Sequence, residues 1–346
     1  KAQFNLGLLL VNQNRLKEAE LTYQNVKRVD SAEHYAKAQF NLGLLLVNQN
    51  RLKEAELTYQ NVKRVDSAEH YAKAQFNLGL LLVNQNRLKE VELAFQNIKR
   101  EDLTEQYAKA QFNLGILLYQ QERFKEAEQA YQNVKREDSA EQYARARFNL
   151  AHLFENQDRF EESKQAYENI KLKDSVELYA KSQLNLGVLF NQKNRIVEAQ
   201  KSYKNVKLIY SAVQYAWAQF NLYNISRDKK YLKNIKLEYD LETYAEAQFL
   251  LGQFTTILNK KNDFWEKIPK ESKQYRKESY QIDVVARIVF LGESKYKNIL
   301  YNIFEKISGI LKSIFIDTDY EKSIAHYTNL TVSKLLLSKE NNNLFK

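Results

Sequence analysis

The chain has 346 residues, of which 44% are hydrophobic and 28% charged, with eight glycines, one proline and no cysteine. So little glycine and proline disfavours a sheet protein with many tight turns, and the missing cysteines exclude disulfides, thiolate metal sites and a cysteine nucleophile. The formal net charge of +10 is spread thinly, and no stretch approaches the ~20 apolar residues of a membrane span, so we expect neither nucleic acid nor a membrane as partner.

A repeat begins at the first residue. Residues 1–36 recur without a single change as residues 37–72. Diverging copies keep the period of 36 residues and begin at Lys73, Lys109, Arg145, Lys181 and Trp217. Such a period is typical of repeat proteins, in which each unit buries its apolar face against its neighbours. Two identical neighbours indicate a recent duplication, so we expect no single copy to hold a unique catalytic residue.

Each copy is predicted to form two antiparallel helices. In the second copy Asp66 lies three residues before Glu69, a spacing typical of a capping box at a helix start. The same cap is predicted at Asp30, Asp102, Asp138 and Asp174. Apolar residues follow at helical spacing, residues 84–87 form the turn, and a second amphipathic helix comes next. Its predicted apolar face consists of Leu88, Val91, Leu93, Phe95 and Ile98.

These positions resemble the tetratricopeptide repeat. The match rests on Asn41-Leu42-Gly43, Leu46, Ala55, Tyr59 and Val62, which fall on the Leu-Gly, large, Ala, aromatic and small positions of that family. The resemblance covers residues 1–270, about seven to eight repeats with the first one truncated. It implies an all-α, right-handed superhelical solenoid of antiparallel helix pairs, in which the glycine lets the two helices approach closely. Ala151 and Tyr223 replace that glycine in two copies, where we expect altered packing.

The resemblance also implies a binding site, because partners of tetratricopeptide proteins lie in a concave groove lined by the first helices. The predicted groove residues are Lys73, Phe76, Leu80, Val83, Asn84, Lys109, Phe112, Ile116, Tyr119, Gln120, Arg145, Phe148, His152 and Glu155. Chaperone-binding members clamp a carboxylate with an asparagine where this chain has leucine, isoleucine, histidine or valine. The groove therefore favours an apolar helix or an extended segment as ligand.

Several alternatives stay open at this stage. The basic residues that open each copy form either a track for an acidic ligand or, as we favour, a solvated helix face. The groove leucines and valines either meet a ligand or pack inside the superhelix. His152 beside Glu155 suggests a metal or acid/base pair, but without a third ligand a plain exposed histidine is favoured. The many aromatic residues sit at fixed repeat positions, which favours core packing over stacking on nucleic acid.

The C-terminal part differs from the repeats. Residues 271–316 are predicted to form a helical cap over the last repeat, and residues 317–346 a strand and helix that begin a further domain. The stretch around His326-Tyr327-Thr328 resembles the opening of a bacterial domain family similar to ADP-ribosyltransferases, in which the histidine helps to bind NAD. That resemblance implies an alternative function: the repeats would be the targeting or sensing arm of a bacterial NAD-using toxin or defence effector, with its catalytic domain beyond residue 346.

We therefore expect a protein-interaction scaffold with a protein or peptide ligand and no enzyme activity, cofactor or metal of its own. Composition rich in Asn, Lys and Ile indicates a bacterial source, and the absence of cysteine fits the cytoplasm. Self-association is a further expectation, because the first copy can expose an apolar face on which another copy stacks.

Overall fold

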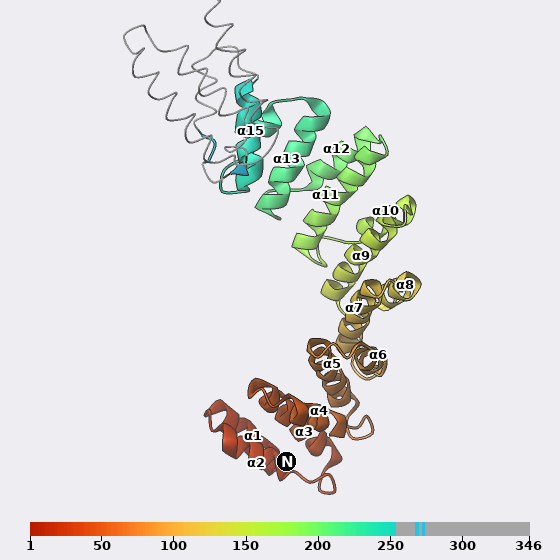
Figure 1. Ribbon diagram of the computed structural model, residues 1–346, viewed down its shortest axis with the longest axis vertical. Coiled ribbons are helices and arrows are strands. Elements are labelled where there is room, and N and C mark those ends of the chain that lie inside the picture. Colours follow the sequence, from red (N-terminus) through yellow and green to blue (C-terminus); the bar gives the residue numbers. More distant parts are fainter. Residues whose placement is uncertain (254–266, 270–271, 274–346) are drawn as a thin grey trace, which may run out of the picture. The chain divides into compact units, whose positions relative to one another are not determined.

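The computed structural model describes residues 1–253, 267–269 and 272–273, and all regular structure in them is helical. This confirms the all-α prediction. The chain divides into two compact units, Lys1–Ile225 and Ser226–Lys346. In the first unit, long first helices alternate with shorter second helices, and within residues 2–205 each helix packs on the next in the chain (Figure 1).

The helix bounds follow the period of the sequence. The pairs of the first unit are α1 (Ala2–Asn12) with α2 (Leu16–Gln24), α3 (Ala32–Asn48) with α4 (Leu52–Asn61), α5 (Ala68–Asn84) with α6 (Leu88–Gln96), α7 (Thr104–Gln120) with α8 (Phe124–Asn133), α9 (Ala140–Glu155) with α10 (Phe160–Glu168), and α11 (Val176–Gln192) with α12 (Ile196–Asn205). Then come α13 (Ala212–Ser226), α14 (Lys230–Lys233) and α15 (Leu241–Gln253).

The two helices of a pair meet where the sequence has its glycine. A Cβ atom on Gly43 of α3 would lie 2.4 Å from Cε1 of Tyr59 on α4, so only a residue without a side chain fits there unless the ring moves. Tyr59 is buried, and so is Ala55 one helical turn before it. The predicted role of the glycine is thus confirmed: it lets the aromatic ring of the second helix lie directly on the backbone of the first.

The first helices begin one residue later than predicted. The N-cap of α5 is Ser67, whose hydroxyl accepts a hydrogen bond from the backbone N–H of His70 at 3.4 Å. The prediction of Asp66 as the cap is wrong, because its carboxylate accepts hydrogen bonds from Arg28 in the loop before the preceding pair, at 2.8 and 3.0 Å. The other predicted aspartate caps are displaced in the same way: the N-cap residues are Ser31, Leu103, Ser139 and Ser175.

The predicted turn at residues 84–87 is confirmed, since α5 ends at Asn84 and α6 begins at Leu88. Asn86 has a φ of 57°, in the left-handed region that asparagine tolerates better than most residues. The predicted apolar face of α6 is wrong at Leu93, which is 58% exposed. Leu93 lies two residues from the buried Val91, about 200° around the helix, and so faces away from the core.

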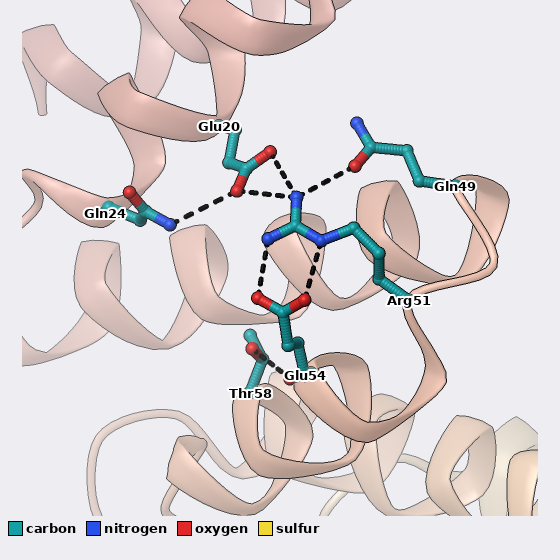
Figure 2. Close-up of polar contacts among 6 residues, drawn as sticks. All are labelled: Glu20, Gln24, Gln49, Arg51, Glu54 and Thr58. Atoms are coloured by element: carbon teal, nitrogen blue, oxygen red, sulfur yellow. Dashed lines mark hydrogen bonds and ion pairs between the residues drawn. The ribbon is translucent and has the colours of Figure 1, made fainter.

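Two rows of ion pairs join successive pairs. In the first row Arg51, in the turn before α4, binds Glu54 of its own pair and Glu20 on α2, at 2.5 and 2.7 Å (Figure 2). The guanidinium lowers the pKa of the Glu54 carboxyl, chiefly through this hydrogen bond. The same contact between neighbouring pairs recurs at 36-residue intervals as Arg87–Glu56, Arg123–Glu92 and Arg159–Glu128.

The second row uses the aspartates that were predicted as caps. Arg100 binds Asp138 at 2.8 Å, and the aspartate side chain is almost fully buried, with 2% of its surface exposed. The equivalent pairs are Arg28–Asp66, Arg64–Asp102 and Arg136–Asp174. A buried carboxylate needs a charged or hydrogen-bonding partner, so each aspartate ties its loop to the loop 36 residues earlier in the chain.

Apart from residues 272 and 273, the predicted cap (residues 271–316) lies outside the described residues, as do the predicted strand and helix (residues 317–346, with His326). The handedness of the predicted superhelix stays a prediction. In the part of the chain that the structure describes, no helix combines the length and the apolar character needed to cross a membrane.

Candidate functional site

The first helices carry the predicted groove residues, and the apolar ones among them are only partly covered. On α5, Leu80 is 42% and Val83 45% exposed, while Leu81 and Leu82 beside them are buried. Their equivalents on α3, Leu44 and Val47, are exposed to a similar degree. The exposed leucines and valines form a strip along the first helices, here called the apolar strip: Leu44, Val47, Leu80 and Val83.

The basic residues that open each copy do not offer free charge. The Nζ atom of Lys73 lies 2.5 Å from a carboxylate oxygen of Glu69, and that of Lys109 lies 2.6 Å from Glu105. Arg145 pairs with Glu141 in the same way at 2.6 Å. Each cation thus has an anion one turn earlier on its own helix, and a row of balanced pairs is typical of a solvated helix face.

The predicted phenylalanines belong to the packing between the helices of a pair. The rings of Phe76 and Phe95 lie 5.8 Å apart, and those of Phe112 and Tyr131 6.2 Å apart, measured between centroids. These distances are typical of packed aromatic pairs. We therefore expect these rings to contribute mainly to the stability of the fold. Only their exposed edges are available to a partner.

The fifth copy is where the face becomes polar. Its α9 has His152 in place of Leu44 or Leu80, and Glu155 in place of Val47 or Val83. Nδ1 of His152 lies 3.1 Å from a carboxylate oxygen of Glu155. The other carboxylate oxygen lies 3.5 Å from the hydroxyl of Ser163, which donates to it from α10.

Neighbouring helices extend this network. The Tyr167 hydroxyl on α10 lies 3.3 Å from the His152 ring nitrogens, and Asn185 on α11 donates its Nδ2–H to that hydroxyl at 3.1 Å. Burial, and next the negative charge of Glu155, raise the pKa of Tyr167, which stays a neutral donor at ordinary pH. Three helices therefore hold the histidine and the glutamate in place.

A cavity of about 330 Å³ opens beside this network, between α9, its following turn and α11. It is lined by His152, Glu155, Asn156, Asp158, Phe160, Asn185, Val188, Leu189, Gln192 and Lys193. Residues 1–253, 267–269 and 272–273 hold no group of three histidine, aspartate or glutamate side chains placed to bind a metal ion. The pair of His152 and Glu155 is thus part of the lining of a polar pocket.

The junction that holds the cavity also lacks the regular ion pairing. Glu128, which binds Arg159, is replaced 36 residues later by Lys164. Arg195 of the sixth pair reaches Glu161 instead, at 3.4 Å. The cavity and the altered contact lie between the same two helix pairs, so the fifth copy departs from the pattern both on its first helix and on its second.

The structure brings together some of the predicted groove residues and separates others. Tyr119 contacts one of the residues that line the cavity, because its hydroxyl accepts a 2.6 Å hydrogen bond from Nδ2 of Asn156. His152 and Glu155 line it, whereas the predicted residues of α5 lie two helix pairs earlier. On α11, Val188 and Gln192 occupy the repeat positions of the predicted Leu80 and Asn84, whereas sequence reasoning missed Asn185, Leu189 and, just after the helix, Lys193. The change from leucine to histidine at position 152 was the available signal.

Helix pairs that repeat the same contacts at a constant period define a helical repeat array. The residues that vary at the predicted groove positions, such as His152 and Glu155, lie on its first helices. A family model described as tetratricopeptide repeat matches residues 4–64, 92–142 and 112–170. These stretches are tetratricopeptide repeats, and such repeats support a protein-interaction scaffold.

Several solved structures match this chain at low sequence identity. The chain is 18% identical to PilF of Pseudomonas aeruginosa, with 60% of this chain and 90% of that one covered and a TM-score of 0.42. The apo form of RapI is 15% identical, with 91% and 99% covered and a TM-score of 0.45. A tetratricopeptide repeat protein of Parabacteroides merdae is 16% identical, with 76% and 96% covered and a TM-score of 0.39. No curated protein sequence matches this one.

Proposed function

We propose that this chain binds a segment of another protein along its first helices, from α5 to α11. The observation that carries the proposal is the exposure of apolar side chains at one set of repeat positions on the first helices. The apolar strip occupies the earlier copies, and the same repeat positions become the polar cavity in the fifth. Apolar side chains exposed in a row favour association, because a partner removes them from water.

The dimensions suit a single segment of a partner. Neighbouring packed helices lie about 10 Å apart, so the three steps from α5 to α11 span roughly 30 Å. A helix of about 20 residues, or an extended segment of about ten, has that length. Anchoring side chains would enter between the leucines and valines, and the cavity would receive one more side chain at the end of the strip.

Substitution within the apolar strip tests the proposal. A tagged array is used to capture proteins from host lysate, with washes at roughly 0.1 M and 0.5 M salt to remove contacts that depend on screened charge. We expect Leu80→Asp to abolish capture of a discrete protein that withstands the high-salt wash.

The matched control is Leu57→Asp, which places the same charge at a 63% exposed leucine on the second helix α4. This variant is expected to capture as the unmodified chain does. Capture that is lost with Leu57→Asp and kept with Leu80→Asp would contradict the proposal, as would recovery of nucleic acid alone.

A further inference from the structure

We propose that the cavity between α9 and α11 is a specificity pocket for an arginine side chain of the bound segment. This inference rests on the proposed function and names the chemistry of its partner. The apolar strip alone would accept many amphipathic segments. A polar pocket at its end would select among them, because a group left unpaired on either side weakens binding.

The first argument is the charge on Glu155. Most carboxylates of the regular repeat contacts, such as Glu54 and Glu69, pair with an arginine or lysine. Within the described chain Glu155 pairs with neither residue type, and its contacts are the His152 ring and the hydroxyls of Ser163 and Tyr167.

Glu155 lies on the proposed binding face. A segment lying along the first helices would cover Glu155 and remove its water. Desolvating a carboxylate is unfavourable unless a cation or several donors replace that water. In the second and third copies the same position is valine, at Val47 and Val83, where no such demand exists. A partner that covers the fifth copy must therefore supply a positive charge at this point.

The other lining residues and the volume of the cavity indicate the charge and the size of the ligand. Asp158 is a second carboxylate without a basic partner in the described chain, and Lys193 is the one cation among the lining residues, with its Nζ 5.8 Å from the ring centroid of Phe160. Two carboxylates against one ammonium disfavour an anionic ligand. A cavity of about 330 Å³ lies at the lower end of ligand pockets, which run ~300–1,000 Å³, and suits one long side chain.

Arginine fits this lining better than lysine. Val188 and Leu189 offer apolar surface for the methylene groups, while Asn185 and Gln192 add an amide group each to the same lining as Glu155. A guanidinium carries five N–H donors in a plane and can bind a carboxylate and amide oxygens at once, whereas an ammonium has three. The contacts from His152 and Ser163 hold the carboxylate in one orientation, which lowers the entropy lost on binding.

The test uses a small probe in place of the unknown partner. Blocked arginine, N-acetyl-arginine methylamide, is titrated into the full chain with labelled histidines, and the imidazole signal of His152 is followed by NMR. We expect a saturable shift with a Kd of roughly 1–10 mM and a response at least tenfold weaker to blocked lysine. A response to blocked lysine equal to that for arginine would overturn the assignment.

Variants at Glu155 locate the effect. Glu155→Val restores the residue found in the second and third copies, so the fold is expected to tolerate it, and circular dichroism checks this. Glu155→Gln keeps the shape and removes the charge. Both should weaken the arginine response at least tenfold, and an unchanged response, or none from the unmodified chain, would overturn the pocket.

A failure of the proposed function can be distinguished from a failure of the pocket assignment. Leu80→Asp leaves the cavity intact and should keep the response to arginine while losing capture of the partner. If Leu80→Asp abolishes capture but blocked arginine does not bind, the proposed binding face is supported and the arginine pocket is overturned. If blocked arginine binds while Leu80→Asp captures normally, the binding face is wrong and the arginine no longer belongs to a segment on that face, which overturns this inference too.

Discussion

At the scale of single residues, the contact between a glycine and an aromatic ring determines how closely the helices of a pair approach. It recurs at Gly115, where a Cβ atom would lie 2.5 Å from Cε1 of Tyr131. Alanine favours a helix by about 1 kcal/mol over glycine, so the substitution sets helix propensity against packing. The overlap with a buried ring is the larger effect, because overpacking a core typically costs about 1–3 kcal/mol.

Gly115→Ala is therefore expected to lower the free energy of unfolding by about 1 kcal/mol, measured by thermal or urea unfolding of the array. The control is the reverse change in the fifth copy, Ala151→Gly, where alanine already lies beneath Tyr167 in a buried position. Its expected cost is about 0.5–1 kcal/mol, from backbone entropy alone. A Gly115→Ala variant more stable than the parent chain would show that helix propensity outweighs the ring contact.

At the scale of helices and loops, the buried aspartates are the contacts on which neighbouring pairs depend. The row ends in the sixth copy, where both members of the next pair change: Leu172 stands in the place of the arginine and Tyr210 in that of the aspartate. The Tyr210 ring packs on Tyr179, with centroids 5.9 Å apart. The same two repeat positions thus hold a charged pair of residues in the earlier copies and an uncharged one here.

This natural replacement allows a double-mutant cycle. Arg100→Leu leaves the buried Asp138 without its cation and is expected to lower stability by about 2 kcal/mol. Arg100→Leu with Asp138→Tyr copies Leu172 and Tyr210, and should recover at least half of that loss in chemical unfolding. The single change Asp138→Tyr completes the cycle. If the losses from Arg100→Leu and Asp138→Tyr simply add in the double variant, the two residues are not coupled.

At the scale of the whole chain, the sequence predicted the helix pairs well because every copy repeats the same local contacts. Gly43 and Tyr59 could be paired from their positions in the repeat. The prediction failed between adjacent candidates, at Asp66 and Ser67, because both can cap a helix and only the tertiary pairing with Arg28 separates them. It failed at Leu93 because an apolar residue on an exposed face interrupts the pattern.

The candidate site was less predictable than the fold. His152 and Glu155 were visible as departures from the repeat. Asn185 was not, because the same asparagine stands in earlier copies at positions 41, 77, 113 and 149. Its part in the cavity arises only from its position opposite a changed α9. Asn185 takes part in the cavity because it lies beside His152 of another helix, and this proximity is visible only in the structure.

The most direct test of the central claim, that a partner lies along the first helices, is site-specific photocrosslinking. Benzoylphenylalanine is placed at Val83 on α5 or at Leu93 on α6, two exposed positions of the same helix pair. After incubation with lysate and irradiation, the account predicts a discrete crosslinked protein from position 83 and none from position 93. The same product from position 93, without one from position 83, would contradict the account and place the partner on the second helices.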